Sequence, residues 1–501
     1  MRLPEGLAAA PQAEAAWEAA RVLEEGGNAA DALVTGALVQ GVVDPHRCGI
    51  GGFGCATVSF PSRGDPVAID FHGHAGERCH ENMWVGAFES VAEDGFGYVL
   101  RHRANDLGYG SITVPGMLAG LHEIHSRFGS MPWRELALRA VPYAEHGFVV
   151  GPHLADYWAR PGAYGRASTQ ERLAFGSEGR RLFLDVAGRT LRAGDVLRQP
   201  DLARTYRSIA DDPACLYVGA LADRIVRDWE EHGANVTRAD LARYRPTVQA
   251  PLTGTFRGAR IVTTPPPGGG AALLQALSLL EGDDVPALGQ HSAACIDRVA
   301  HVLHAVGRER LGADSPCTTQ LTIVDRDENA ISFSHSLGFG SGVVTPSLGF
   351  VHNNCMSGFD PRPGRPGSIA PGRARTTAIA ETLVWDDDGL RLVMGSPGAA
   401  RITAALAQVL LAVLEFDVGI AEAVVQPRFF PFGERRLELE SRFPSQTILE
   451  LASRGWRAQR SIKPFGQVGR VYAIEIDRRG PTPKLRAGID PGEPGAGYRA
   501  I

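Results

Sequence analysis

Hydrophobic residues near the start of the chain recur at the spacing of α-helices. Apolar side chains follow one another every three or four positions over 13–25, and a Gly-Gly pair then ends this predicted helix. A second helix is predicted over 29–43, where Asn28 can cap the first turn and Asp31 suits the positive helix end. Because this second segment is apolar almost all round, we expect it to be buried.

Strands are predicted where apolar and polar residues alternate. The sequences TTQLTIVD and AISFSHSL, over 318–325 and 330–337, alternate on either side of a turn at 326–329. Further strands are expected around 56–60, 66–71, 261, 377–384 and 390–394, and further helices within 114–149 and 201–241 and over 271–280, 292–310 and 402–416. Helices and strands come in blocks without a clear linker, which favours one large layered α/β unit.

Composition places the chain among globular proteins with a large core. Its 501 residues are 44% hydrophobic and 21% charged, and the formal charge is −5. Proteins that bind nucleic acid or a membrane surface usually carry a basic stripe, so neither partner is expected. The longest apolar stretch, 402–416, is shorter than a membrane span, and the N-terminus lacks the apolar core of a signal peptide. The expected compartment is the cytoplasm.

Two motifs in the first hundred residues resemble ligand sites. Gly49–Gly54 reads GxGxxG, but it follows a predicted helix and enters a strand, the reverse of a dinucleotide-binding unit. We interpret it as a tight loop in which glycines allow positive φ or close backbone approach. His72, His74, Cys79 and His80 crowd one segment, but their spacing fits no strong structural zinc pattern. No metal and no cofactor is therefore expected.

Cleavage of the Cys317–Thr318 peptide bond would create a reactive group that strand propensity does not reveal. If this peptide bond is cut, Thr318 becomes a new N-terminus that carries both a hydroxyl and a free amine. An α-amine titrates near neutrality, so it can take the hydroxyl proton and activate the nucleophile. The tetrahedral oxyanion would need backbone amides, which the loop at 395–399 could supply. The alternative is an ordinary strand start and a simple strand-to-helix connection.

Six blocks of sequence occur in a characteristic order. They are GGNAADALVTGALVQGVVDPHRCGIGGFG (26–54), VPGMLAGL (114–121), PPPGGGAALLQAL (265–277), TTQLTIVDRDENAISFSHSL (318–337), FGSGVVTPSLGFVHNNCMSGFD (339–360) and GSPGAARI (395–402). Together they resemble the gamma-glutamyltransferase family of N-terminal-nucleophile enzymes over almost the entire chain. The resemblance implies a four-layer αββα sandwich whose precursor cleaves itself between Cys317 and Thr318. A large segment, 1–317, and a small segment, 318–501, would together form one αββα unit.

The resemblance also implies roles for individual residues. Thr318 would be the nucleophile, and Ser336 stands in the place of a second hydroxyl that hydrogen-bonds it. Gly398 and Ala399 stand where two glycines form the oxyanion hole, and alanine is tolerable there if its amide is the group used.

The expected substrate pocket departs from the family at four positions. His72 stands where relatives that bind glutamyl groups have an arginine for the α-carboxylate, and Gly338 stands in the place of an asparagine. Ser357 replaces the aspartate that holds the α-amino group, and Thr377-Ala378 replaces a double serine. The pocket is therefore not built for a zwitterionic glutamyl head.

Other side chains are expected to contact a different substrate. His72, His74 or Arg375 could meet a carboxylate placed differently from that of glutathione. Thr319 can support the site, and Gln320 replaces the usual histidine.

The chain is thus interpreted as a self-processing acyltransferase or hydrolase that acts on a small-molecule acyl donor other than glutathione, with water or an amine as acceptor. Family branches with altered pockets keep other activities open: acylases, oxamate-type amidohydrolases, and homologues from 4-alkyl-proline antibiotic pathways that cleave an acyl C–C bond. A catalytically silent binding protein is the non-enzymatic alternative. Retention of Thr318, Ser336 and the GSPG loop weighs against it.

Overall fold

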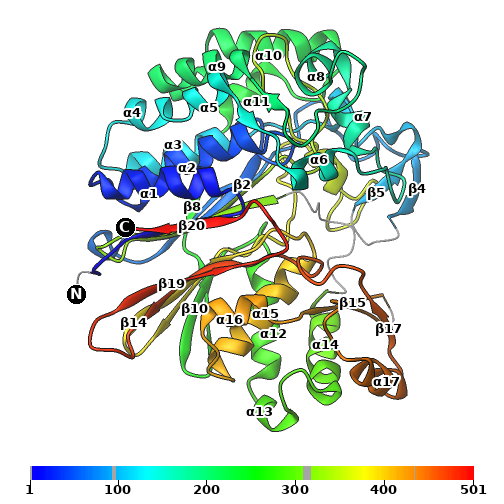
Figure 1. Cartoon of the computed structure of the whole chain (residues 1–501). Helices are drawn as coiled ribbons and strands as arrows, with labels where there is room; N and C mark the ends of the chain where they lie inside the picture. The colour runs from blue at the N-terminus through cyan, green and yellow to red at the C-terminus, as the bar shows by residue number, and fades with distance from the viewer. Residues whose placement is uncertain (1–2, 93–96, 308–317, 434) are drawn as a thin grey trace.

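Two β-sheets are stacked face to face, and helices cover both outer faces (Figure 1). The structure, a computed structural model, describes residues 3–92, 97–307, 318–433 and 435–501. The four-layer αββα sandwich implied by the family resemblance is confirmed.

The first sheet has the strand order β20-β1-β11-β12-β2-β3-β8, and its neighbouring strands run antiparallel. Its strands are β1 (Leu7–Ala10), β2 (Phe53–Ser59), β3 (Val67–Phe71), β8 (Thr247–Gln249), β11 (Thr318–Val324), β12 (Ala330–Ser336) and β20 (Gly497–Ala500). The helices above it include α1 (Ala13–Glu24), α2 (Ala29–Val43), α3 (Met117–Phe128), α4 (Trp133–Leu138), α5 (Val141–His146), α9 (Pro200–Asp211), α10 (Ala220–Glu231) and α11 (Arg238–Arg243).

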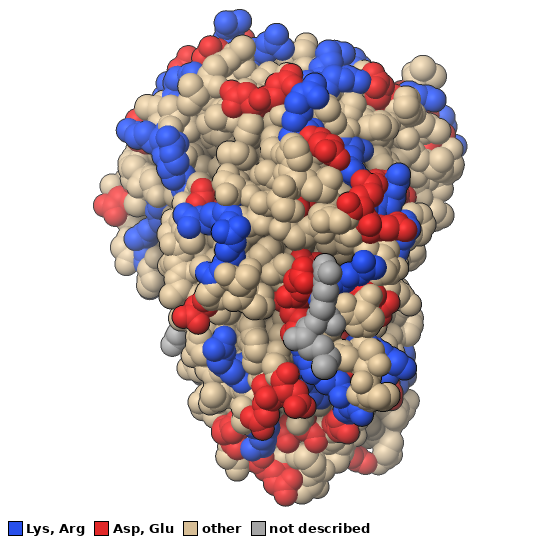
Figure 2. All heavy atoms as spheres, turned by 90° about the vertical axis from the view of Figure 1, so that its left-hand side faces the viewer, with Lys and Arg blue, Asp and Glu red and all other residues tan. Residues whose placement is uncertain are grey.

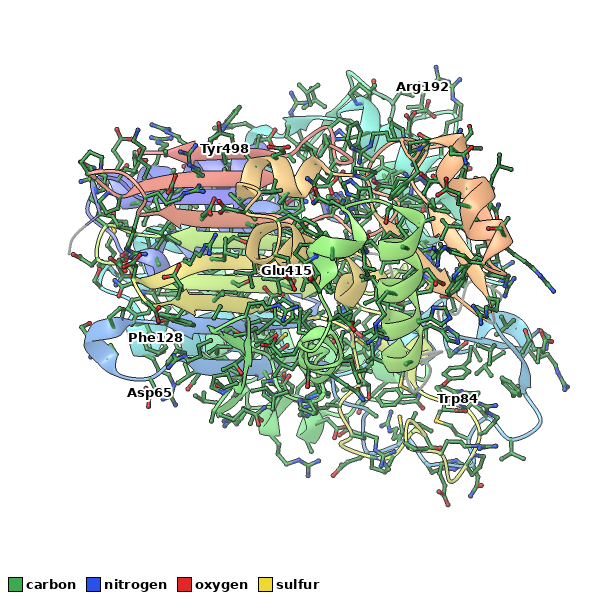
Figure 3. All side chains as sticks on the ribbon, turned by 90° about the horizontal axis from the view of Figure 1, so that it is seen from below. Asp65, Trp84, Phe128, Arg192, Glu415 and Tyr498 are labelled. Atoms are coloured by element: carbon green, nitrogen blue, oxygen red, sulfur yellow. The ribbon has the colours of Figure 1, made fainter. Side chains whose placement is uncertain are left out.

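The second sheet has the order β19-β18-β14-β13-β10-β9. Its strands are β9 (Leu252–Phe256), β10 (Ala259–Thr263), β13 (Thr382–Asp386), β14 (Gly389–Gly395), β18 (Tyr472–Asp477) and β19 (Lys484–Ile489). The helices below it are α12 (Gly270–Leu280), α13 (Val285–Leu288), α14 (Ala293–Gly307), α15 (Arg401–Leu414) and α16 (Ile420–Val425). Figure 3 looks onto this side, with Glu415 at the C-terminal end of α15.

Smaller elements surround the sandwich. They are α6 (Pro152–Trp158), α7 (Thr169–Leu173), α8 (Gly176–Phe183), α17 (Ser445–Ser453), the pairs β4 (Phe88–Val91) with β5 (Tyr98–Leu100) and β6 (Phe148–Val149) with β7 (Val196–Leu197), and the sheet of β15 (Phe429–Phe432), β16 (Arg436–Leu439) and β17 (Arg457–Arg460). No helix in the described part of the chain is both long and apolar enough to cross a membrane. Figure 2 shows Lys and Arg interspersed with Asp and Glu on one face, so charge does not mark a single strip there.

Most of the predicted elements are confirmed, and one strand is partly wrong. The strand expected over 377–384 begins only at Thr382. Its partner β10 pairs Thr263 with Thr382 and then leaves the sheet in the proline- and glycine-rich turn, so no strand is available beside 377–381. The helix expected over 292–310 is observed as α14, and positions 308–310 lie outside the described residues.

A capping box begins the buried helix α2. Asn28 Oδ1 accepts hydrogen bonds from the amides of Ala30 (2.9 Å) and Asp31 (3.1 Å), and Asp31 accepts one from the Asn28 amide. Asn28 Nδ2 also donates to the carbonyl of Phe128 at the end of α3 (2.7 Å). One side chain thus satisfies orphan amides and ties two helices together.

The glycines before and at the start of β2 allow close backbone approach, as interpreted from the sequence. Gly49 has a φ of +138°, which favours glycine. A Cβ on Gly52 would lie 2.4 Å from the carbonyl oxygen of Ser336, and one on Gly54 would lie 2.0 Å from that of Ser334. Side chains at these two positions would push β2 away from β12.

Polar side chains line the space between the two sheets. Gln320 on β11 lies opposite Ser334 on β12 in the strand ladder. The side-chain amide of Gln320 donates a hydrogen bond to Oε2 of Glu381, the residue before β13 of the second sheet (2.9 Å). Ser332 Oγ lies within hydrogen-bond distance of the same carboxyl oxygen and of the carbonyl oxygen of Met394 on β14 (2.9 Å), and it has one proton to share between them. These contacts join the two sheets beneath the start of β11.

Glu381 is fully buried in this inter-sheet network. Burial raises its pKa to about 7, although the hydrogen bonds from Ser332 and Gln320 oppose part of that rise. Its second oxygen, Oε1, has no hydrogen-bond partner among the described residues. A negative charge at this site is therefore costly, and the carboxyl holds its proton well above the usual range.

Asn28→Ala should lower the free energy of unfolding by about 1–2 kcal/mol, because the helix cap and the bond to Phe128 are both lost. Asn28→Ser, which keeps a capping oxygen, should recover about half of the loss. Denaturant titration at fixed pH measures both values. An Asn28→Ala midpoint equal to that of the unchanged protein would show that the cap does not stabilise α2.

Glu381→Gln should change how stability depends on pH. An unfolded glutamate ionises near 4.5 and the folded one near 7, so its contribution is full below pH 4.5 and is lost as pH rises through 7. Between pH 5 and pH 8 the unchanged protein should lose about 2–3 kcal/mol relative to the variant. Denaturant titrations of both proteins across this range measure the difference. Parallel pH curves would show that the buried carboxyl does not titrate there.

Candidate active site

The first residue of β11 lies directly opposite the last residue of β12. Thr318 and Ser336 are cross-strand partners, and both are almost fully buried. Ser336 Oγ accepts a hydrogen bond from the amide of Gly338 (2.9 Å). Because the ladder is continuous from this pair to Val324 and Ala330, strand register determines where the Thr318 side chain points.

Thr318 and Ser336 line one small pocket between the sheets. The other lining residues are Phe53, Arg375, Thr377, Ile379, Ala399 and Ile402. The lining combines apolar side chains with hydroxyl groups and one guanidinium. Such a mixture suits the binding of a small molecule with a charged or polar group.

The loop before α15 provides backbone groups to this pocket. Ala399 lines it and has a φ of +57°, a left-handed conformation that costs alanine about 1 kcal/mol. Gly398 has a φ of +151°, and a Cβ there would lie 2.7 Å from Gly469 Cα. The loop leads into the N-terminus of the 14-residue helix α15, whose partial positive charge favours a developing anion.

Buried ion pairs hold this loop against the strand that carries Ser336. The Arg470 amide donates to the Pro397 carbonyl (3.0 Å), and the Arg470 guanidinium pairs with Glu493. Glu493 also pairs with Arg47 (2.9 Å), whose carbonyl accepts from the Leu337 amide (2.8 Å). Burial alone would raise the pKa of Glu493, but Arg47 and Arg470 outweigh it and lower the value to about 2.

A carboxylate, an imidazole and a hydroxyl form a row beside the pocket. Asp70 Oδ1 lies 2.5 Å from His72 Nδ1 and also accepts from the His72 amide (2.9 Å). His72 Nε2 lies 2.8 Å from Thr377 Oγ1, and the imidazole is buried. Burial alone would raise the pKa of Asp70, but the adjacent His72 lowers it overall, so Asp70 is ionised at neutral pH.

Arg375 is a buried guanidinium in the wall of the same pocket. Its Cζ lies 5.5 Å from the centre of the Phe53 ring. A Cβ on Gly358 would lie 2.2 Å from Arg375 Nε, so only glycine lets the arginine lie flat against that backbone. Burial raises the pKa of neighbouring Cys355 to about 11 despite the opposing effect of Arg375, so this thiol is not a thiolate at neutral pH.

The structure brings some of the predicted site residues together and places others apart. Thr319 points to the opposite side of the sheet, where it donates to Gln12 (3.0 Å) and accepts from Gln40 on α2 (3.1 Å). Gln320 belongs to the inter-sheet network rather than to the pocket lining. Both residues are therefore placed to hold β11 in position.

The remaining predicted residues are not among those that line the pocket. Gly338 has a φ of +74° and lies against Asn354, because a Cβ there would be 2.2 Å from Asn354 Oδ1. Ser357 Oγ donates to the Asn354 carbonyl (2.9 Å). His74 is half-buried, its ring lies 5.1 Å from that of Tyr244, and burial lowers its pKa. Cys317 lies outside the described residues.

Sequence reasoning missed several residues of this region. The apolar lining residues Phe53, Ile379 and Ile402 come from three separate elements, and no local pattern connects them. Asp70 is absent from the predicted site residues, although its carboxylate orients His72. The serines at 332, 334 and 336 alternate along a buried strand, and this pattern could have indicated the polar inner face.

The residues considered for zinc do not converge. Within the described ranges, no group of three or more His, Cys, Asp or Glu side chains could hold a metal ion. His80 is exposed, whereas Cys79 is buried. Burial raises the pKa of Cys79 to about 12, so its thiol is a poor metal ligand.

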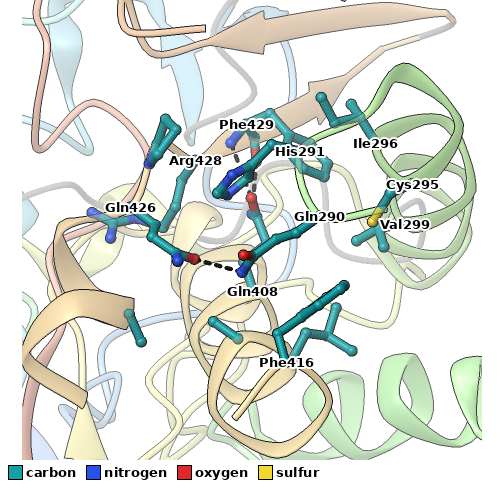
Figure 4. A pocket seen from close by; sticks show the side chains of 14 residues that line it. Gln290, His291, Cys295, Ile296, Val299, Gln408, Phe416, Gln426, Arg428 and Phe429 are labelled. Atoms are coloured by element: carbon teal, nitrogen blue, oxygen red, sulfur yellow. Dashed lines mark hydrogen bonds between the residues drawn. The ribbon is translucent and has the colours of Figure 1, made fainter. Parts of the chain in front are cut away.

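A second, larger pocket lies between α14, α15 and the segment before β15 (Figure 4). In its lining, the Gln290 side-chain amide donates to Gln426 Oε1 (2.8 Å). Burial raises the pKa of its one cysteine, Cys295, to about 11. With a protonated thiol and neutral amides, this pocket is less suited to nucleophilic chemistry than the Thr318 pocket.

Comparisons with known proteins agree with this geometry. A family model described as Gamma-glutamyltranspeptidase matches residues 15–314 and 304–500. The chain is 30% identical over 498 residues to the Acylase ACY 1 proenzyme of Pseudomonas sp. (strain V22), covering 90% of this chain and 87% of that protein. It is 30% identical over 481 residues to the Glutathione hydrolase proenzyme of Pseudomonas aeruginosa, covering 84% and 82% of the two chains.

A solved structure extends the likeness to the whole fold. The cephalosporin acylase from Bacillus halodurans superimposes with a TM-score of 0.82 at 25% identity, covering 100% of this chain and 96% of that one. The family expected from the six sequence blocks is thereby confirmed. The chain belongs to the gamma-glutamyltranspeptidase family of enzymes.

Proposed function

We propose that this chain is a self-processing acyltransferase or hydrolase with Thr318 as its nucleophile. The observation that carries the proposal is the shared pocket of Thr318, Ser336 and Ala399, in which a hydroxyl at the start of a strand meets the loop at a helix N-terminus. Cleavage between Cys317 and Thr318 would free the α-amine needed to activate that hydroxyl. The names of both relatives include "proenzyme", which supports a precursor that is cut.

The reaction then follows from the geometry. The α-amine takes the Thr318 hydroxyl proton, and Oγ attacks the carbonyl carbon of the acyl donor. The amides of Gly398 and Ala399 stabilise the oxyanion, helped by the positive end of α15. The amine returns its proton to the leaving group, and water or an amine acceptor releases the acyl group from Thr318. Ser336, opposite Thr318, is placed to orient the nucleophile.

The segments 1–317 and 318–501 would stay together after cleavage. Strands β1, β2, β3 and β8 precede the proposed junction and share the first sheet with β11, β12 and β20, which follow it. The second sheet likewise combines β9 and β10, which precede the junction, with β13, β14, β18 and β19, which follow it. Separation would break hydrogen-bonded strand pairs in both sheets, so the two segments are proposed to act as one unit.

The pocket supports an acyl donor that carries a carboxylate and no α-ammonium group. Arg375 lines the pocket and offers a planar fork that fits a carboxylate. Ser357, in place of the expected aspartate, has its hydroxyl directed to a backbone carbonyl and brings no negative charge. The first relative is named an acylase, which agrees with an acyl donor other than glutathione.

The purified protein should separate into fragments of residues 1–317 and 318–501, and the smaller one should begin Thr-Thr-Gln. Thr318→Ala should remain one chain of 53.5 kDa, because it has no hydroxyl to attack the preceding carbonyl. Thr318→Ser should still cleave. Intact-mass spectrometry reads all three results. Cleavage of Thr318→Ala at the same bond, or an uncut natural protein after prolonged incubation, would remove Thr318 from the proposed role.

Glutaryl-p-nitroanilide should be cleaved at least about tenfold faster than gamma-glutamyl-p-nitroanilide, measured as kcat/KM. The two probes differ only by the α-amino group, for which the pocket offers no described carboxylate.

Arg375→Gln should lower kcat/KM for the glutaryl probe by about 10²-fold or more, since a buried charge pair is lost. Valeryl-p-nitroanilide, which lacks the carboxylate, should be affected less than about threefold. Equal losses on both probes would show that Arg375 does not bind a carboxylate, and efficient gamma-glutamyl turnover would contradict the proposed pocket.

A further inference from the structure

Self-cleavage raises a chemical requirement that the mature site does not have. Before the bond to residue 317 is cut, the nitrogen of Thr318 is part of a peptide amide and has no basic lone pair. The nucleophile therefore cannot use its own amine as the base during this first reaction. Another group near the Thr318 hydroxyl must accept its proton.

The row of Asp70, His72 and Thr377 has the geometry of a base that reaches the pocket. Asp70 Oδ1 is an ionised acceptor beside His72 Nδ1, so the imidazole carries its proton on Nδ1. Its other nitrogen, Nε2, then presents a lone pair to Thr377 Oγ1 at 2.8 Å. This carboxylate–imidazole–hydroxyl order is that of known hydrolytic triads, which are recognised by geometry rather than by sequence position.

Surrounding contacts hold the row in place. The Tyr244 hydroxyl donates to the His72 carbonyl (2.9 Å), and the Phe53 ring lies 6.0 Å from the imidazole. The Thr377 amide donates to the Pro267 carbonyl (2.9 Å), and the amide of Ile379 lies 3.4 Å from Thr377 Oγ1. Imidazole and hydroxyl are both buried, so bulk water is not placed to act as the base in their stead.

Thr377 joins this row to the nucleophile, because it lines the same small pocket as Thr318. We propose that Asp70, His72 and Thr377 form a proton relay that serves as the base for self-cleavage at Thr318. The inference rests on the proposed function, since it assumes Thr318 as the attacking residue. Thr377 would exchange the proton with the reacting atoms, while His72 and Asp70 act through it.

The reaction balances without any further reagent except water. Thr318 Oγ forms a bond to the carbonyl carbon of residue 317, and its proton passes to Thr377 as the Thr377 proton passes to His72 Nε2. The carbon–nitrogen bond breaks, and the nitrogen takes a proton back along the relay to become the free amine. Water then adds to the ester, releasing the new carboxyl terminus and restoring the Thr318 hydroxyl. From then on the amine can serve as base.

The relay requires a neutral imidazole, because only a free lone pair on His72 Nε2 can take the Thr377 proton. The titratable groups around it are Asp70 and His74 on its own segment, Cys55 on β2, Tyr244 after α11, and Arg375 in the pocket wall.

The test follows cleavage of freshly made precursor, which needs no external substrate. The full chain is synthesised in a cell-free system, synthesis is stopped, and the 318–501 fragment is quantified over time. Thr377→Val removes the hydroxyl at nearly constant shape and should slow cleavage about 10²–10⁴-fold. Thr377→Ser should restore it to within about tenfold. His72→Gln, which can hydrogen-bond but cannot take a proton, should slow cleavage to a similar degree.

His80→Gln is the matched control, because it removes an exposed histidine from the same segment. It should cleave at the natural rate. If Thr377→Val and His72→Gln cleave at that rate, the relay is refuted while Thr318 keeps its role. If Thr377→Val and Thr377→Ser are equally slow, the hydroxyl is not in the proton path and the relay is also refuted. If Thr318→Ala is cut, the proposed function itself fails.

Discussion

The antiparallel register of β11 and β12 is the constraint on which the site depends. It sets Thr318 opposite Ser336 at the end of the ladder and aims both side chains into the space between the sheets. A slip of one residue would turn Thr318 toward α2 and bring Thr319 into the pocket. Glycines at 52 and 54 let β2 pair closely along the other side of β12, because any side chain there would collide with the β12 backbone.

Electrostatics around the pocket follow from burial. Charges that are paired at short range stay ionised, as in the Arg47–Glu493–Arg470 cluster that ties the loop of Gly398 and Ala399 to the end of β12. Within the described part of the chain Glu381 has hydrogen bonds but no cation beside it, and its pKa rises to about 7 instead. The same rule makes Asp70 a carboxylate and hence assigns the His72 proton to Nδ1.

Local patterns and contacts between distant segments differ in how well sequence predicts them. The capping box at Asn28 and the alternation over β11 and β12 are local, and the elements were predicted nearly to the residue. The alternation places Thr318 and Ser336 on two strands joined by a turn, and the structure pairs them across the ladder. Contacts such as His72 with Thr377 join residues 305 positions apart, and no local pattern encodes them. The false strand start at 377 had a similar cause, since β10 turns away from it.

The central claim is that Thr318 carries the acyl group during turnover. The most direct test of this claim is to mix the mature protein with the p-nitrophenyl monoester of glutaric acid and to quench the reaction in acid during the initial burst of p-nitrophenol release. The modified peptide is then mapped by mass spectrometry. A glutaryl adduct of one equivalent on the first residue of the fragment that begins Thr-Thr-Gln is the predicted result. An adduct on Thr377, on Cys295 or on any residue other than Thr318 would contradict the account.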